Sequence, residues 1–123
     1  MSALSLGDNV AAYSAWGNYF KFQTYLERQV ESIGRKGDIL FILSTGGGDI
    51  KTKQSINLIN AAKKAKKNGL KVISLLGKTG GILANKKYSD KFYVVKSNKT
   101  SVIQECHISI IHYICYLIDK EFE

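Results

Sequence analysis

Short apolar runs alternate along the chain with segments of helical periodicity, and this alternation limits the possible folds more than any other feature. Residues 39–43 are a continuous apolar run of strand length, which predicts a strand buried on both faces, and residues 72–76 predict the next buried strand. Residues 92–95 form a third run. Because no hairpin signal joins one run to the next, the pattern predicts an α/β fold, with parallel βαβ units in three αβα layers.

Helical spacing marks the segments between these runs. Apolar residues recur at steps of four, four and three within residues 18–33, which predicts an amphipathic helix that ends at Gly34. Further helices are predicted over residues 56–65, 82–88 and 101–120, and a further strand over residues 4–6.

Length and composition fit a single domain over residues 1–123. The chain has 123 residues and is 45% hydrophobic, enough for one modest core. No apolar run approaches the ~20 residues of a membrane-spanning helix, and the N-terminus lacks the features of a signal peptide, so we expect a cytoplasmic protein without a membrane partner. Cys106 and Cys115 are nine positions apart in a predicted helix, roughly 13 Å along its axis, which predicts two free thiols.

The positive charge is concentrated in one part of the chain. The net charge is +8, and residues 51–99 contain thirteen lysines against the single acid Asp90. This imbalance is compatible with anionic ligands, including nucleic acid. A solvated lysine face is the commoner explanation, and no aromatic residues interleave with the lysines of residues 63–67 to stack bases. Nucleic acid is therefore the least favoured partner.

The stretch Ser44-Thr-Gly-Gly-Gly48 follows the first buried run and precedes a helix. Backbone amides in such a turn favour a phosphate group, and Ser44 and Thr45 add hydroxyl donors. The same residues also suit an ordinary loop, and no Gly-Lys-Ser/Thr closes the stretch as in a Walker loop. Asp49 comes next, although a carboxylate would repel a phosphate dianion in a partly desolvated site.

Four motifs occur in order along the chain. They are Gly37-Asp38, Ser44-Thr-Gly-Gly47, Gly77-Lys-Thr-Gly-Gly81, and Gln104-Glu-Cys-His107 followed by His112. In combination they resemble the SIS (sugar isomerase) domain family, and within it the phosphoheptose isomerases. The resemblance implies a three-layer αβα fold with a parallel sheet. It also implies an aldose–ketose isomerase that converts sedoheptulose 7-phosphate to D-glycero-D-manno-heptose 7-phosphate for surface polysaccharide.

The resemblance implies a set of substrate-binding residues. Ser44, Thr45 and Gly46 match part of the family's phosphate loop. If six residues are inserted after this loop, Ser55 aligns with a further phosphate-binding serine and also suits a helix N-cap. Asn18 matches a substrate-binding asparagine of the family, although its neighbour Tyr19 stands where the family has an aspartate. An N-cap role fits Asn18 equally well.

The last predicted helix carries the proposed proton-transfer group. Isomerisation moves a proton between adjacent carbons and needs a base with a pKa near neutrality, which favours His112 as the catalytic residue. The resemblance implies that Gln104 and His112 contact the substrate, and that in zinc-dependent members the same positions hold zinc; it implies no nucleotide. Roughly 12 Å of helix separates the two residues, so ligands from another subunit would be needed. Alternatively, His112 is a hydrogen-bonded core or interface residue, and His107 is structural or solvent-facing.

The family pattern begins before the first motif of this sequence. Family members have a strand that leads to Gly-Asn-Gly-Gly-Ser, followed by a helix with the catalytic Glu and a metal-binding His. This sequence has no counterpart of either element. We therefore expect a partial, N-terminally truncated SIS domain with uncovered apolar surface. We also expect this chain to be inactive alone, unless a separate N-terminal half supplies the glutamate. The alternative is a non-catalytic SIS module that binds phosphosugars or a protein partner. The resemblance also implies a homotetramer with active sites between subunits.

Overall fold

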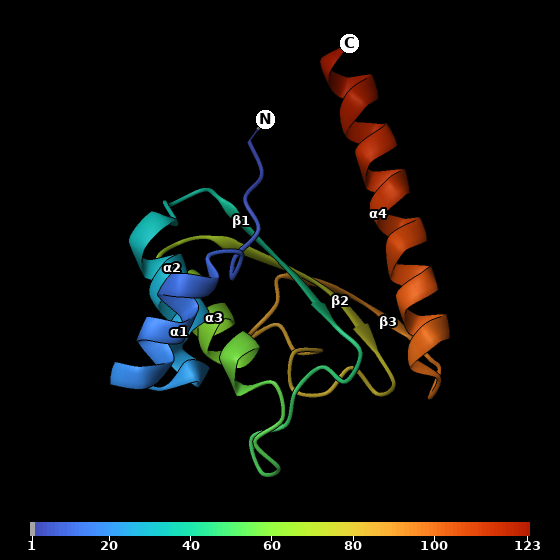
Figure 1. Ribbon diagram of the computed structural model, residues 1–123. Coiled ribbons are helices and arrows are strands. Elements are labelled where there is room, and N and C mark those ends of the chain that lie inside the picture. Colours follow the sequence, from blue (N-terminus) through green and yellow to red (C-terminus); the bar gives the residue numbers. More distant parts are fainter. Residues whose placement is uncertain (1) are drawn as a thin grey trace.

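The computed structural model describes residues 2–123 as a small parallel sheet with helices on both sides (Figure 1). In chain order the elements are α1 (Val10–Tyr19), the 3-10 helix η1 (Phe22–Thr24), α2 (Tyr25–Ile33), β1 (Ile39–Ser44), α3 (Ile56–Lys67), β2 (Lys71–Gly77), β3 (Lys91–Val95) and α4 (Thr100–Phe122). The predicted strands over residues 39–43, 72–76 and 92–95 and the predicted helices over residues 56–65 and 101–120 are confirmed within a few residues.

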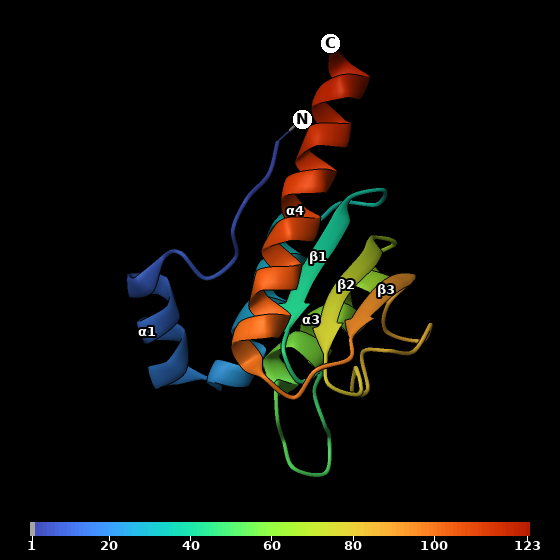
Figure 2. The same cartoon turned by 90° about the vertical axis from the view of Figure 1, so that its right-hand side faces the viewer.

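The three strands lie in the order β1-β2-β3, and both pairs are parallel. Ile39 pairs with Lys71, and Ile73 pairs with Lys91, so the carboxyl ends of all three strands meet at one edge. The helices α1, α2 and α3 lie on one side of the sheet and α4 lies on the other, as Figures 1 and 2 show from two directions. The predicted three-layer αβα arrangement is therefore confirmed.

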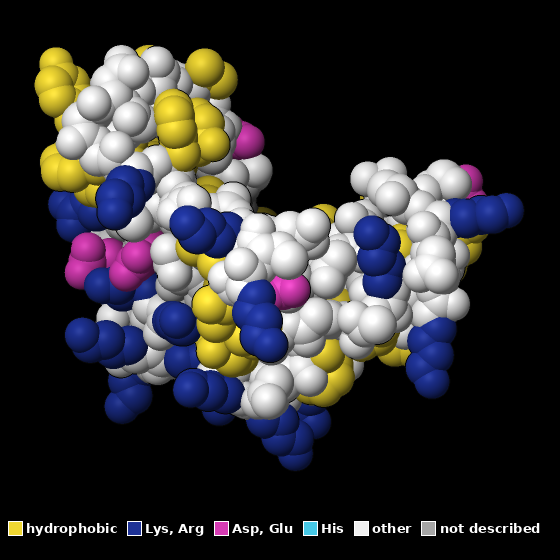
Figure 3. All heavy atoms as spheres, turned by 90° about the horizontal axis from the view of Figure 1, so that it is seen from below, with side chains coloured by type: hydrophobic (Ala, Val, Ile, Leu, Met, Phe, Trp, Pro, Cys, Tyr) yellow, Lys and Arg dark blue, Asp and Glu magenta, His cyan; other side chains and the backbone are white. Residues whose placement is uncertain are grey.

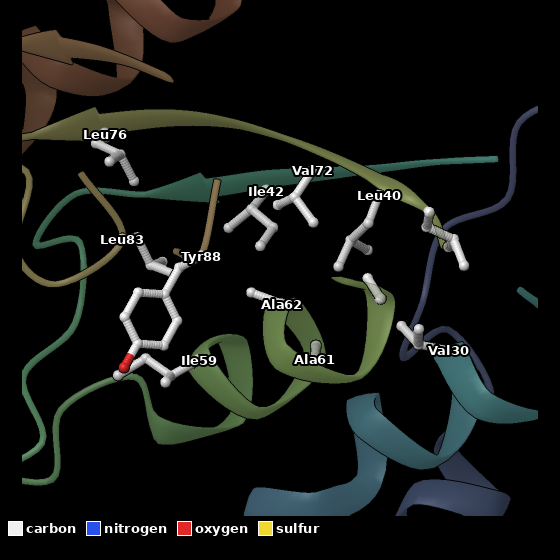
Figure 4. Close-up of a cluster of buried hydrophobic side chains, with 12 residues drawn as sticks. Val30, Leu40, Ile42, Ile59, Ala61, Ala62, Val72, Leu76, Leu83 and Tyr88 are labelled. Carbon is white, nitrogen blue, oxygen red and sulfur yellow. The ribbon is translucent and has the colours of Figure 1, made fainter. Parts of the chain in front are cut away.

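The main core lies between the sheet and α3. Leu40 and Ile42 of β1 point toward Ala62 on α3, and Leu76 of β2 lies near Leu83 from the loop that follows (Figure 4). Small alanines on α3 let the helix approach the sheet closely, which maximises dispersion contacts. This packing fixes α3, and with it the loop that enters the helix.

The other face of β1 is open, so the prediction that this strand is buried on both faces is wrong. Burial alternates along β1, and Ile39, Phe41 and Leu43 are exposed. The reason is that α4 packs on β2, where Ile103 lies against Gly77, and leaves β1 uncovered. The expectation of uncovered apolar sheet surface is confirmed.

The predicted helix over residues 18–33 is also wrong, because two helices and a corner occupy this region. The carboxamide of Asn9 accepts a hydrogen bond from the Ala12 amide and caps α1 at its N-terminus. At the corner, the Trp16 indole donates to the Thr24 hydroxyl at 2.9 Å. Asn18 lies in the last turn of α1, which excludes the N-cap role considered for it.

Two minor predictions are wrong as well. Residues 4–6 form no strand, and residues 82–88 form successive turns instead of a helix. In these turns the carbonyl of Asn85 accepts from the amides of both Tyr88 and Ser89 at 2.9 Å. The apolar side chains of Leu83 and Tyr88 that suggested a helix are buried against α3 and the sheet (Figure 4).

Helix α4 is attached to the sheet only near its start. Ile103 and His107 are its buried residues, and the C-terminal half projects beyond the sheet with Tyr113, Tyr116 and Leu117 exposed (Figure 1). By length and composition α4 would suffice to cross a membrane, and only 11% of its most apolar window is buried. The statement that no segment approaches such a span is therefore wrong for α4, although Ile103 and His107 near its start pack on the sheet.

Candidate functional site

The two glycine turns predicted from the sequence pack against each other at the carboxyl edge of the sheet. The amides of Ile82 and Leu83 donate to the carbonyls of Gly48 and Gly47, each at 3.0 Å. A Cβ atom at Gly47 would lie 1.8 Å from the carbonyl oxygen of Gly80, so no other residue fits there. The second turn therefore holds the first in a single conformation.

The side chain of Ser44 stabilises the first turn through a hydrogen bond inside it. Its buried hydroxyl accepts a hydrogen bond from the Gly47 amide at 3.0 Å, which leaves its own proton free to be donated. None of the described residues accepts a hydrogen bond from the backbone amides of Thr45, Gly46 or Gly48. A turn with several free amides and a hydroxyl is an anion-binding concavity, as expected for a phosphate.

Asp49 starts a six-residue hairpin rather than entering this concavity. Its amide donates to the carbonyl of Gln54 at 3.0 Å, and the two residues form an isolated antiparallel bridge. Its carboxylate accepts from the amide of Lys51 at 2.7 Å and more weakly from that of Thr52 at 3.4 Å. The charge is thus bound within the hairpin of residues 49–54, which explains how a carboxylate can follow a phosphate turn.

Because the hairpin closes between Asp49 and Gln54, Ser55 lies beside the first turn. Ser55 precedes α3, and a Cβ at the neighbouring Gly48 would lie 2.9 Å from the side chain of Ile59 in the same helix. Ser55 is in the left-handed region (φ 52°), and its side chain makes no capping hydrogen bond. Ser55 thus occupies the predicted N-cap position of α3 but does not cap the helix with its side chain, and the hydroxyl of this half-buried residue remains available to a ligand.

The two histidines of α4 have different environments. His107 is buried, and its Nε2 lies 3.0 Å from the carbonyl oxygen of Leu76, so the structural reading of His107 is confirmed. Gln104 and His112 are both exposed along the helix. This surface lies across the sheet from α3, and a second chain could approach it.

The described residues of one chain do not supply a complete set of zinc ligands. Among residues 2–123 no three His, Cys, Asp or Glu side chains are grouped so that they could hold a metal ion. Gln104 and His112 are eight residues apart on one helix, roughly 12 Å along its axis. These two residues alone do not fit the tetrahedral, four-ligand coordination that zinc prefers.

Asn18 is separate from these groups. Its side chain is exposed in the last turn of α1, which packs on α2 and η1. The substrate-binding role that the resemblance implies for Asn18 therefore stays a prediction.

Asp90, the single acid among residues 51–99, has a structural role. Its carboxylate accepts from the Nζ of Lys66 and from the amide of Val72, the latter at 2.8 Å. These two hydrogen bonds, the lysine first, lower the pKa of Asp90 below its ordinary value. Asp90 thereby joins α3 to the start of β3.

Sequence reasoning missed the contact between the two glycine turns. The signal lay in the paired glycines 47–48 and 80–81, all of which have positive φ angles. Two such pairs, each following a parallel strand, could have suggested a close backbone approach at the shared edge of the sheet.

Comparison with known proteins gives no matching family model. The sequence is 42% identical over 122 residues to a phosphoheptose isomerase of Nitratiruptor sp., a match covering 99% of this chain and 61% of that protein. It is 39% identical over 121 residues to one of Clostridium acetobutylicum, covering 98% and 58%.

Solved structures agree with the sequence comparison. A phosphoheptose isomerase from Francisella tularensis superposes with a TM-score of 0.86 at 34% identity, covering 96% of this chain and 59% of that one. One from Neisseria gonorrhoeae gives a TM-score of 0.84 at 34% identity, covering 95% and 62%. The chain thus spans about three fifths of the length of its relatives. Over nearly all of its own length, the chain is similar in sequence and in fold to the phosphoheptose isomerases.

Proposed function

We propose that this chain forms the phosphate-binding part of a sugar-phosphate isomerase that interconverts sedoheptulose 7-phosphate and D-glycero-D-manno-heptose 7-phosphate. The observation that carries the proposal is the anion-binding turn of residues 44–48, with Ser55 beside it, in a chain 42% identical to a phosphoheptose isomerase. The free amides and the hydroxyls of Ser44, Thr45 and Ser55 would bind the phosphate group. Gly46 has no atoms within 4 Å of its Cβ position, which leaves space for the ligand there.

The proton transfer is assigned to His112. The reaction moves a proton between two adjacent carbons of the sugar, and an imidazole is suited to this near neutral pH. His112 is exposed on α4, on the opposite side of the sheet from α3, so we propose that it serves a phosphate turn of another copy of the chain. Gln104, exposed on the same helix, would bind the sugar.

We also propose that the apolar surface of α4 is covered by another copy in a homo-oligomer, with a tetramer as the expected form. Tyr113, Tyr116 and Leu117 are exposed, and beyond the sheet nothing in the described part of the chain covers them. Protein rather than lipid is favoured because α4 already packs on the sheet through Ile103 and His107. A zinc ion would need ligands from a further chain, and no step of the reaction is assigned to it.

The proposal can be tested by incubating the protein with sedoheptulose 7-phosphate in D₂O and following the reaction by NMR. The isomerase predicts deuterium at C2 of the aldose product, and loss of this signal in His112→Asn. Binding without turnover would support the phosphate-binding role and would fit both the non-catalytic module and an isomerase that needs the missing catalytic glutamate from another chain. Absence of both binding and turnover would contradict both functions.

A further inference from the structure

A hollow of about 520 Å³ lies beside the second glycine turn. It is bounded by that turn, by the edge strand β3 and by the loop that leads into α4. Its lining residues are Lys78, Thr79, Ala84, Phe92, Val94, Lys96, Ser97 and Asn98. The volume is in the range of sites for small metabolites.

The hollow faces away from α4. Phe92 and Val94 of β3 pair with Ser74 and Leu76, and Leu76 points into the core under α3. Side chains alternate between the faces of a strand, so these positions lie on the α3 side, whereas Gly77 faces Ile103 of α4. The hollow also shares no residue with the proposed sugar-phosphate site.

The lining combines cationic, polar and aromatic groups. Lys78 and Lys96 provide two ammonium groups, and Thr79 and Ser97 provide hydroxyls, while no carboxylate lines the hollow. Figure 3, a view onto the carboxyl end of the sheet, shows many Lys and Arg side chains and few acidic ones at this end of the molecule. An anion would therefore find complementary charge and hydrogen-bond donors there.

The ring of Phe92 adds a requirement for shape. Phe92 is 41% exposed on an edge strand and lines the hollow together with Lys78 and Lys96. An exposed aromatic ring next to lysines can stack on a planar group of a ligand whose phosphate is held by the lysines.

From this arrangement we propose that the hollow binds a phosphorylated ring compound of the nucleoside monophosphate class. The phosphate would lie with Lys78 and Lys96, and the base would stack on Phe92. The compound would be a ligand distinct from the sugar phosphate, bound on the opposite side of the sheet from α4.

The test measures binding of adenosine monophosphate, ribose 5-phosphate and inorganic phosphate by titration calorimetry. Adenosine monophosphate should bind with a Kd of about 1 mM or below, and inorganic phosphate about tenfold more weakly, because it lacks the stacked base. Phe92→Ala should weaken adenosine monophosphate about tenfold and leave inorganic phosphate unchanged. Lys78→Gln combined with Lys96→Gln should weaken adenosine monophosphate about tenfold, while inorganic phosphate keeps its binding to the proposed sugar-phosphate turn.

A matched control separates the site from diffuse charge. Lys67→Gln combined with Lys86→Gln removes the same charge from exposed lysines outside the hollow and should leave both affinities unchanged within about twofold. Equal loss in the two double variants would overturn the proposal. So would no binding of adenosine monophosphate to the unmodified chain, or an adenosine monophosphate affinity that Phe92→Ala leaves unchanged. Ribose 5-phosphate, which the proposed sugar-phosphate turn would also bind, is the control ligand whose affinity should not respond to Phe92→Ala. Circular dichroism should confirm that each variant is folded.

Discussion

The Nε2 atom of His107 lies 3.0 Å from the carbonyl oxygen of Leu76, and this hydrogen bond joins the terminal helix to the central strand. Together with buried Ile103, it is what attaches α4 to the sheet near the carboxyl edge, where the glycine turns lie. His112, five residues further along the helix, is exposed and outside this contact.

The two histidines should therefore differ in what their removal affects. His107→Ala should lower the free energy of unfolding by about 2 kcal/mol, because it removes a buried side chain and a hydrogen bond. His112→Asn should change it by less than about 0.5 kcal/mol while reducing any isomerase activity. Urea denaturation and the activity assay check both; a large stability loss for His112→Asn would contradict the assignment.

The contact between the glycine turns predicts a sharp difference between neighbouring residues. Gly47→Ala should destabilise the fold by more than about 2 kcal/mol, because its Cβ would lie 1.8 Å from the Gly80 carbonyl oxygen and its φ is 69°. Gly46→Ala is the control, since no atom lies within 4 Å of its Cβ position. Thermal unfolding of both variants is the measurement, and similar melting temperatures would show that the turns do not pack as described.

The hairpin predicts that a serine matters more than the aspartate for phosphate binding. Ser55→Ala should weaken sugar-phosphate binding about tenfold by removing a free hydroxyl. Asp49→Asn should change it by less than about twofold, because the carboxamide can still accept from the amides of Lys51 and Thr52. Titration calorimetry compares the two, and equal or reversed effects would count against the proposed register.

The hydrogen bonds of Asp90 should make the free energy of unfolding decrease in acid. Folding lowers the pKa of Asp90 below its ordinary value of 3.8. Asp90 therefore contributes to the free energy of unfolding above about pH 4, and this contribution is lost as the pH falls through the lower pKa of the folded state. Asp90→Asn should cost about 1 kcal/mol at pH 7, since the Lys66 pair is partly open to solvent, and should flatten the stability profile below pH 4. Denaturation curves between pH 2 and 7 measure this effect, and Asp119→Asn, at an exposed residue, is the control. If Asp90→Asn had the same dependence of stability on pH as the unmodified protein, Asp90 would have no such role.

The sequence predicted the parallel sheet because short apolar runs separated by helical segments have few other solutions. It did not predict the corner between α1 and α2, because this depends on contacts of side chains such as Trp16 with Thr24 that leave no periodic signal. The exposed face of β1 was missed for a related reason. An apolar run indicates burial but does not say which element covers it.

For the candidate site, the glycine turns were predictable from their composition, and the resemblance added Ser55. The role of Asp49 was not predictable, because it depends on the hairpin closing between Asp49 and Gln54. Local hydrogen bonds of this kind compete with ligand contacts and are decided by backbone geometry.

The central claim is that backbone amides and hydroxyls at the carboxyl end of β1 bind the phosphate of a sugar. The most direct test is an amide NMR titration of the ¹⁵N-labelled protein with sedoheptulose 7-phosphate. We predict saturable shifts at Thr45, Gly46, Gly48 and Ser55 that inorganic phosphate reproduces in direction. Saturable binding that leaves these four amides unshifted, with changes confined to lysine-rich surfaces elsewhere, would contradict the claim.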